Sequence, residues 1–262
     1  MDHARPSHRP LFERILCGVD GTSASLVAVR QALRLREADG SVHLAVAVPL
    51  AKAAHAGVAA THAADVLRRE AETALADARA LAPSAGSKLV GGDPGAALLK
   101  EAEAEGATVI AVGSHGRRRA AGILLGTVAA KVLRDAPCSV LIAREARDEE
   151  SWPRSIVVGV DGSEGSAAAF EAARSVAERF GGSLRVAAAT GAHVDVEAAR
   201  GIAADLEEQP EGAVDVLVAA SESADLVVVG SRGLHGLKAL GSVSERVAHR
   251  AESSVLVVRS PS

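Results

Sequence analysis

The chain repeats itself. The segment ILCGVDGT at residues 15–22 returns as IVVGVDGS at residues 156–163, 141 positions later. Two later pairs, ATVIAVGSHG with ADLVVVGSRG and SVLIAR with SVLVVR, are 117 and 115 positions apart. Similarity at this spacing predicts two copies of one folding unit. The chain of 262 residues is long enough for two domains of about 100–150 residues, each with its own core.

Short apolar runs alternate with alanine-rich segments of helical periodicity. In the first copy the expected strands are residues 15–19, 42–48, 88–90, 109–112 and 140–143, and the expected helices are residues 23–37, 59–81 and 94–105. The last helix has clear end signals: Asp93 as N-cap, Pro94 at the first position and Gly106 after the end. The strands are largely continuous apolar runs, which favours burial on both faces. Strands that alternate with helices predict an α/β fold with a parallel sheet.

The spacing of the repeats divides the chain. We expect a disordered tail at residues 1–10, a first domain at 11–144, a charged linker at 145–153 and a second domain at 154–260. The offset falls from 141 to 117 between the VDG and GSxG segments, so the second copy is 24 residues shorter there. No convincing strand stands out in residues 201–213, and we therefore expect a shortened second domain in which the third strand can be missing.

Composition narrows the function classes. The net charge of −4 and the aromatic content of 2% disfavour nucleic-acid binding, because they leave neither a basic surface nor many rings for base stacking. Two cysteines indicate a reducing compartment rather than a disulfide framework. The first ten residues lack the apolar centre of a signal peptide, and no run of 18 apolar residues follows. We expect a cytoplasmic protein with no membrane partner.

A glycine-rich loop follows the fourth strand of each copy. In the first copy, Gly113 and Gly116 come directly after the strand, and Gly126-Thr127 follows a nine-residue spacer at the start of a helix. Glycines let the backbone approach a phosphate, and the amides of a helix N-terminus point at an anion. Asp20 ends the first strand, where a carboxylate can accept hydrogen bonds from ribose hydroxyls. The other reading of these glycines, as ordinary turn residues, is less favoured because spacing, strand and upstream acid occur together. The loop has no lysine of the Walker A type.

These motifs resemble the universal stress protein family. The resemblance rests on VDGT at residues 19–22, on G-x2-G-x9-G-T at residues 113–127 and on PCSVLIA at residues 137–143, and it extends through both halves. It implies two tandem doubly wound, Rossmann-like domains, each with a parallel sheet of order 3-2-1-4-5, and ATP, with or without Mg²⁺, between strands 1 and 4. The site residues that it implies in domain 1 are Asp20, Val48, Gly113, Gly116, Gly126, Thr127 and Val128.

The second copy departs from the pattern. The corresponding residues are Asp161, Gly230, Gly233, Gly241 and Ser242. Its spacer, residues 234–240, has seven residues instead of nine, and Ala189 stands where a larger residue would border the purine. A shorter spacer cannot follow the same path around a triphosphate, so we expect domain 1 to hold most of the nucleotide.

The resulting hypothesis is an ATP-binding stress-response protein whose nucleotide biases its conformation or its partners. The alternative is a nucleotide-free interaction module whose C-terminal strands, residues 140–143 and 255–258, pair within the chain or in a homodimer, since exposed apolar edge strands need covering. No catalytic nucleophile, general base or metal cluster stands out. We therefore expect no enzyme, beyond a slow incidental ATPase activity.

Overall fold

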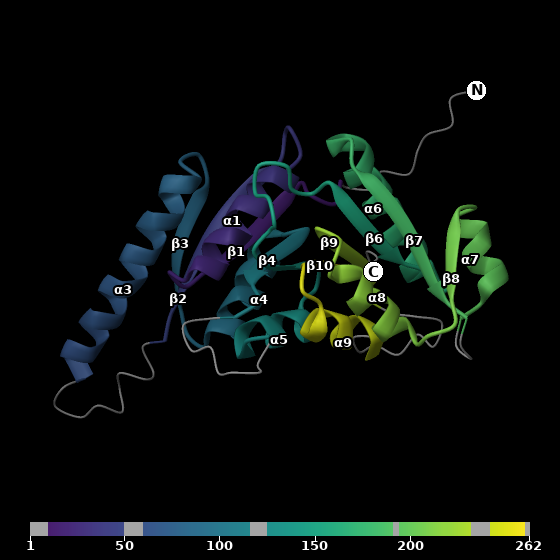
Figure 1. The fold of residues 1–262 in the computed structure, drawn as a ribbon. Helices are drawn as coiled ribbons and strands as arrows, with labels where there is room; N and C mark the ends of the chain where they lie inside the picture. Colours follow the sequence, from purple (N-terminus) through teal and green to yellow (C-terminus); the bar gives the residue numbers. More distant parts are fainter. Residues whose placement is uncertain (1–9, 50–59, 116–124, 191–193, 232–241, 260–262) are drawn as a thin grey trace, which may run out of the picture.

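A computed structural model describes residues 10–49, 60–115, 125–190, 194–231 and 242–259 (Figure 1). The first half contains β1 (Arg14–Val19), α1 (Ser23–Leu35), β2 (Ser41–Val48), α3 (Ala60–Leu81), β3 (Gly86–Gly91), α4 (Pro94–Glu105), β4 (Val109–Gly113), α5 (Thr127–Asp135) and β5 (Ser139–Ala143). The second contains β6 (Ser155–Gly159), α6 (Glu164–Phe180), β7 (Ser183–Ala189), α7 (Val196–Ile202), β8 (Leu206–Gln209), α8 (Ala213–Ser221), β9 (Leu226–Gly230), α9 (Ser242–Arg250) and β10 (Ser254–Val258). The predicted tail lies, except for Pro10, outside the described residues.

Ten strands form one mixed sheet in the order β3-β2-β1-β4-β5-β10-β9-β6-β7-β8. Each half is parallel within itself and has the order 3-2-1-4-5 counted along its own chain, which confirms the predicted doubly wound, Rossmann-like fold. The two apolar cores lie on opposite faces of the sheet and run through both halves. One includes residues of α1, α3, α6 and α7, and the other includes residues of α4, α5, α8 and α9. The central strands are buried on both faces, as their continuous apolar runs predicted.

The two halves meet at their last strands. β5 and β10 pair antiparallel, with Leu141 opposite Leu256, and all five residues of each strand are buried. The expected pairing of C-terminal strands therefore occurs within one chain.

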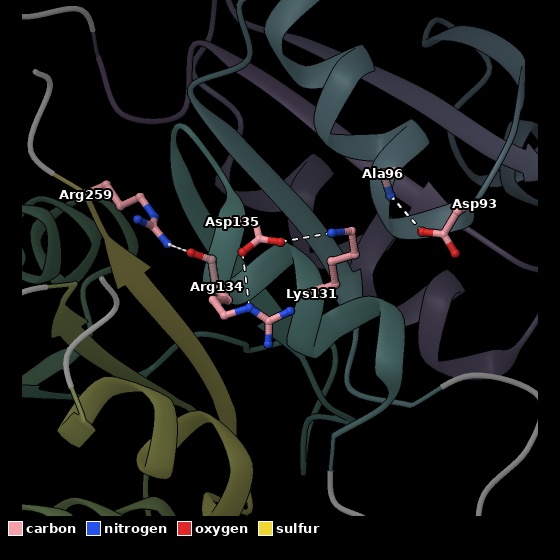
Figure 2. Close-up of polar contacts among 6 residues, drawn as sticks. All are labelled: Asp93, Ala96, Lys131, Arg134, Asp135 and Arg259. Atoms are coloured by element: carbon pink, nitrogen blue, oxygen red, sulfur yellow. Dashed lines mark hydrogen bonds and ion pairs between the residues drawn. The ribbon is translucent and has the colours of Figure 1, made fainter. Parts of the chain in front are cut away.

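The predicted helix ends are confirmed for α4. The Asp93 carboxylate accepts a hydrogen bond from the Ala96 amide at 3.1 Å (Figure 2), and Gly106 adopts the left-handed conformation at φ 57°. These two residues fix where α4 begins and ends.

The third strand of the second half, which the sequence left open, is present. β8 pairs in parallel with β7, with Leu206 opposite Val186. Its sequence, LEEQ, carries no apolar signal because β8 is a sheet edge and two of its side chains form ion pairs: Glu207 with Arg185 at 3.0 Å and Glu208 with Arg200 at 2.6 Å. The second half is shorter in the connection that precedes this strand. Its helix α7 has 7 residues, whereas the equivalent helix of the first half, α3, has 22.

Among the residues described, no helix combines the length and the apolar character needed to cross a membrane.

Candidate functional site

The candidate site lies at the carboxyl edge of β1 and β4. These neighbouring strands are parallel, with Gly18 opposite Val112, so Asp20, directly after β1, and Gly113, the last residue of β4, lie at the same edge. The strand order reverses between β1 and β4. After β1 the chain adds β2 on one side of the sheet, and after β4 it adds β5 on the other side. Ligands of open α/β sheets bind outside the strand ends at such a switch point.

Asp20 is held by its own turn. Its Oδ1 accepts hydrogen bonds from the Thr22 amide at 3.0 Å and from the Thr22 hydroxyl at 2.6 Å. Thr22 Oγ1 in turn accepts from the Ser25 amide at 3.2 Å and caps α1. Gly21 supplies the left-handed conformation of the turn at φ 79°. The start of α1 and the orientation of the Asp20 carboxylate are therefore fixed together.

Gly113 has a packing role at the end of β4. A Cβ atom there would lie 2.6 Å from the carbonyl carbon of Ala24 and 2.7 Å from its oxygen. Gly230 is in the same position in the second half, where a Cβ would lie 2.5 Å from the Gly165 carbonyl oxygen. The close approach of α1 to β4, and of α6 to β9, thus requires glycine whether or not a phosphate binds. From the sequence, these glycines were interpreted as phosphate-binding or as ordinary turn residues, and helix packing against the strand end was not predicted.

The N-terminus of α5 completes the edge. Gly126 is its N-cap in an extended conformation, no side chain caps the helix and its first turn holds no acidic residue. The first amides of a helix have no partner within the helix, so this end favours an anion. Thr127 is exposed and Val128 is half-buried, which leaves the first turn accessible.

One hydrogen bond joins the two glycine segments. The Gly126 amide donates to the Ser114 carbonyl oxygen at 2.7 Å, while the Ser114 amide donates to the Ala143 carbonyl oxygen at 3.0 Å. Ser114 is buried and also bonds His115 Nδ1 through its hydroxyl at 2.9 Å. Ser114 had no predicted role of its own. Its recurrence as Ser231, whose amide donates to Val258 at 2.8 Å, was the signal that could have identified it.

The remaining predicted residues divide into two groups. Val48 is buried at the end of β2, next to β1 at the same edge, and its carbonyl oxygen accepts from the Gly92 amide at 3.2 Å. Gly116, Gly233 and Gly241 lie outside the described residues. Ser242 begins α9, and its side chain is outside them as well. The structure therefore brings Asp20, Val48, Gly113, Gly126, Thr127 and Val128 to one edge of the sheet.

The second half has the same acidic corner. Asp161 Oδ1 accepts from the Ser163 amide at 3.0 Å and from its hydroxyl at 2.6 Å, with Gly162 at φ 85°. The surroundings of this corner differ, however. The Asp195 amide donates to the Asp161 carbonyl oxygen at 3.2 Å, and a Cβ on Gly162 would lie 2.8 Å from Ala198 Cβ. The short α7 thus begins directly against the corner.

The family model of the universal stress protein family matches residues 11–144 and 194–259. The chain belongs to the universal stress protein family. A universal stress protein of Methanocaldococcus jannaschii is 28% identical over 148 residues, which cover 53% of this chain and 86% of that protein. One of Mycobacterium tuberculosis is 34% identical over 146 residues, covering 50% of this chain and 95% of that protein. A solved universal stress protein structure from Archaeoglobus fulgidus superposes with a TM-score of 0.74 at 21% identity, covering 94% of this chain and 98% of that one, and shows the shared fold.

Proposed function

We propose that this universal stress protein binds ATP at the carboxyl edge of β1 and β4, and that the bound nucleotide biases its conformation or its partners. One arrangement supports the proposal: the fixed Asp20 carboxylate follows β1, and the uncapped α5 N-terminus is held by the Gly126–Ser114 hydrogen bond at the end of β4, the strand paired with β1. An acid for ribose and amides for phosphate are the two groups that a nucleotide needs from such an edge.

In this proposal Asp20 accepts from the ribose hydroxyls and Val48 borders the adenine. The amides of Thr127 and Val128 donate to phosphate oxygens, while the Gly126 amide stays on the Ser114 carbonyl oxygen and holds the start of α5 at the end of β4. When bound, Mg²⁺ would neutralise part of the phosphate charge, and no protein ligand is assigned to it.

The energetics are sufficient without a lysine. Each hydrogen bond to a charged group contributes about 1.5–3 kcal/mol, so three or four contribute about 5–12 kcal/mol before binding costs. Micromolar affinity corresponds to about 8 kcal/mol. We therefore expect micromolar or weaker binding, which suits a protein that responds to the nucleotide rather than consuming it.

The second half is proposed to contribute little to binding. Its Asp161 corner is intact, but α7 begins against it, so a ribose and α7 would compete for the same space. The alternative function is a nucleotide-free interaction module whose domains pair through their C-terminal strands. The β5–β10 pairing agrees with this alternative as well, but it leaves neither strand as an edge for a homodimer.

A matched pair of variants tests the assignment by calorimetric titration. Asp20→Asn keeps the Oδ1 acceptor that holds Thr22 but replaces the second oxygen by a donor, so we expect about a three- to tenfold loss of ATP affinity. Asp161→Asn makes the same change in the second half and should leave the affinity within about twofold of the unmodified protein. Equal losses in both variants would contradict a site confined to the first half.

A ligand series tests phosphate recognition. ATP should bind more tightly than adenosine, because adenosine cannot use the α5 amides. Cyclic AMP completes the series, since a solved universal stress protein that matches half of this chain at 30% identity is a complex with cAMP. Equal affinities for ATP and adenosine would contradict the role assigned to α5.

A further inference from the structure

Arg259, at the end of the second half, reaches into the first half. Its guanidinium donates to the carbonyl oxygen of Leu133 at 2.7 Å, in the last turn of α5. It also donates to the carbonyl oxygen of the next residue, Arg134, at 3.2 Å (Figure 2). Its main-chain amide donates to the hydroxyl of Ser139 at 3.0 Å, at the start of β5. The last carbonyls of a helix have no partner within the helix and carry its negative dipole end, so a cation there holds that end in place.

Arg179, on α6 of the second half, does the same for α1. It donates to the carbonyl oxygens of Leu35 at 2.8 Å, Arg34 at 2.7 Å and Arg36 at 2.7 Å. Its guanidinium also lies 4.9 Å from the centre of the Phe180 ring, which restricts it further. Both arginines therefore cross from the second half to the C-terminal end of a helix in the first.

The two helices are those whose other ends frame the candidate site. α1 begins at Ser23, directly after the Asp20 turn, and α5 begins after Gly126. With 13 and 9 residues, they are rods of about 20 and 14 Å. Holding the far end of a short rigid helix limits how its near end can tilt. The position of the α5 amides relative to Asp20 thus depends on both contacts.

We propose that Arg179 and Arg259 are positioning residues through which the second half sets the nucleotide affinity of the first half. This inference rests on the proposed ATP site. It assigns the second half a role that requires no nucleotide of its own.

Arg144 supplies a matched control, because it makes the corresponding contact in the opposite direction. It follows β5 as Arg259 follows β10. Its guanidinium donates to the carbonyl oxygen of Ala248 at 2.6 Å, in the last turn of α9, and to that of Ser253 at 3.2 Å, just before β10. Replacing it removes an arginine contact between the halves but leaves the far ends of α1 and α5 held.

The experiment compares ATP affinity by calorimetry in full-length Arg259→Ala, Arg179→Ala and Arg144→Ala, with thermal unfolding of each. We expect about a three- to tenfold loss in the first two and less than twofold in the third, at comparable losses of thermal stability. Arg259→Lys should recover part of the loss, since it restores a cation at the helix end, and it keeps the test open if the alanine variant does not fold.

The outcomes separate the two proposals. If the unmodified protein binds ATP and Arg144→Ala weakens binding as much as Arg259→Ala, or neither changes it, the positioning role is overturned and the site stands. If the unmodified protein binds no ATP, both proposals fail. Hydrogen exchange adds a readout that needs no ligand: the Gly126 amide should exchange faster in Arg259→Ala than in Arg144→Ala, and equal rates would overturn the positioning role.

Discussion

The main-chain amide of Asp195 donates a hydrogen bond to the carbonyl oxygen of Asp161, at 3.2 Å. This bond holds the start of α7 against the turn that follows β6. The contact is tight enough that Gly162 has no room for a side chain. It follows from the shortened connection between β7 and β8, which leaves α7 only 7 residues long. In this way a deletion in one connection changes the surroundings of a corner whose own hydrogen bonds are the same in both halves.

Gly162→Ala should destabilise the protein more than Gly181→Ala. Both glycines have positive φ, at 85° and 60°, so alanine costs about 1–2 kcal/mol at either position. At Gly181 nothing lies within 4 Å of the added Cβ, whereas at Gly162 it would lie 2.8 Å from Ala198 Cβ and from the Asp195 carbonyl oxygen. We expect about 1–3 kcal/mol of additional loss at Gly162, measured by urea denaturation. Equal losses would show that α7 does not sit against the corner.

Trp152→Phe should lower the free energy of unfolding by about 1–3 kcal/mol. Trp152 is 2% exposed, and its Nε1 donates to the Asp225 carbonyl oxygen at 3.1 Å, just before β9. Phenylalanine fills part of the space but leaves that carbonyl without this donor. Urea denaturation followed by circular dichroism measures the change, and stability within about 0.5 kcal/mol of the unmodified protein would contradict a structural role for this hydrogen bond.

Both thiols should resist alkylation in the folded protein. Burial raises the pKa of Cys17 to about 12 and that of Cys138 to about 11, so at pH 8 almost no reactive thiolate is present. Mass spectrometry after iodoacetamide treatment should find no adduct in native protein and two in protein unfolded in urea. Rapid labelling of Cys17 under native conditions would contradict its placement inside the sheet.

Sequence reasoning reached most of the fold because the repeated strands are apolar on both faces. β1 and β4 begin and end within one residue of the predicted ranges, and the Asp93 and Gly106 ends of α4 follow from local backbone chemistry. β8 could not be found in this way. At a sheet edge its stability comes from backbone pairing and from ion pairs with Arg185 and Arg200, which leave no apolar pattern.

The place of the candidate site was predicted in part, and its unpredicted features depend on tertiary contacts. The sequence placed Asp20 at a strand end and Gly126 at a helix start, where the structure has them. It could not show that Gly113 is required by the close approach of Ala24, so Gly113→Val is a poor test of phosphate binding: it would disturb packing first. Arg144 and Arg259 occupy matching places in the two repeats, directly after SVLIA and SVLVV. That each of them contacts a helix of the other half depends on the β5–β10 pairing, which the repeat alone does not show.

The most direct test of nucleotide binding in the first half is the ATP stoichiometry and affinity of Thr127→Glu compared with Ser242→Glu. Each places a carboxylate at the first residue of a helix, α5 or α9, where it favours the helix but repels phosphate. Thr127→Gln controls for the shape of the new side chain. We predict one ATP bound per unmodified chain, loss of binding in Thr127→Glu, and retention in both Thr127→Gln and Ser242→Glu. Absence of binding by the unmodified protein, or loss of binding in Ser242→Glu with retention in Thr127→Glu, would contradict the account.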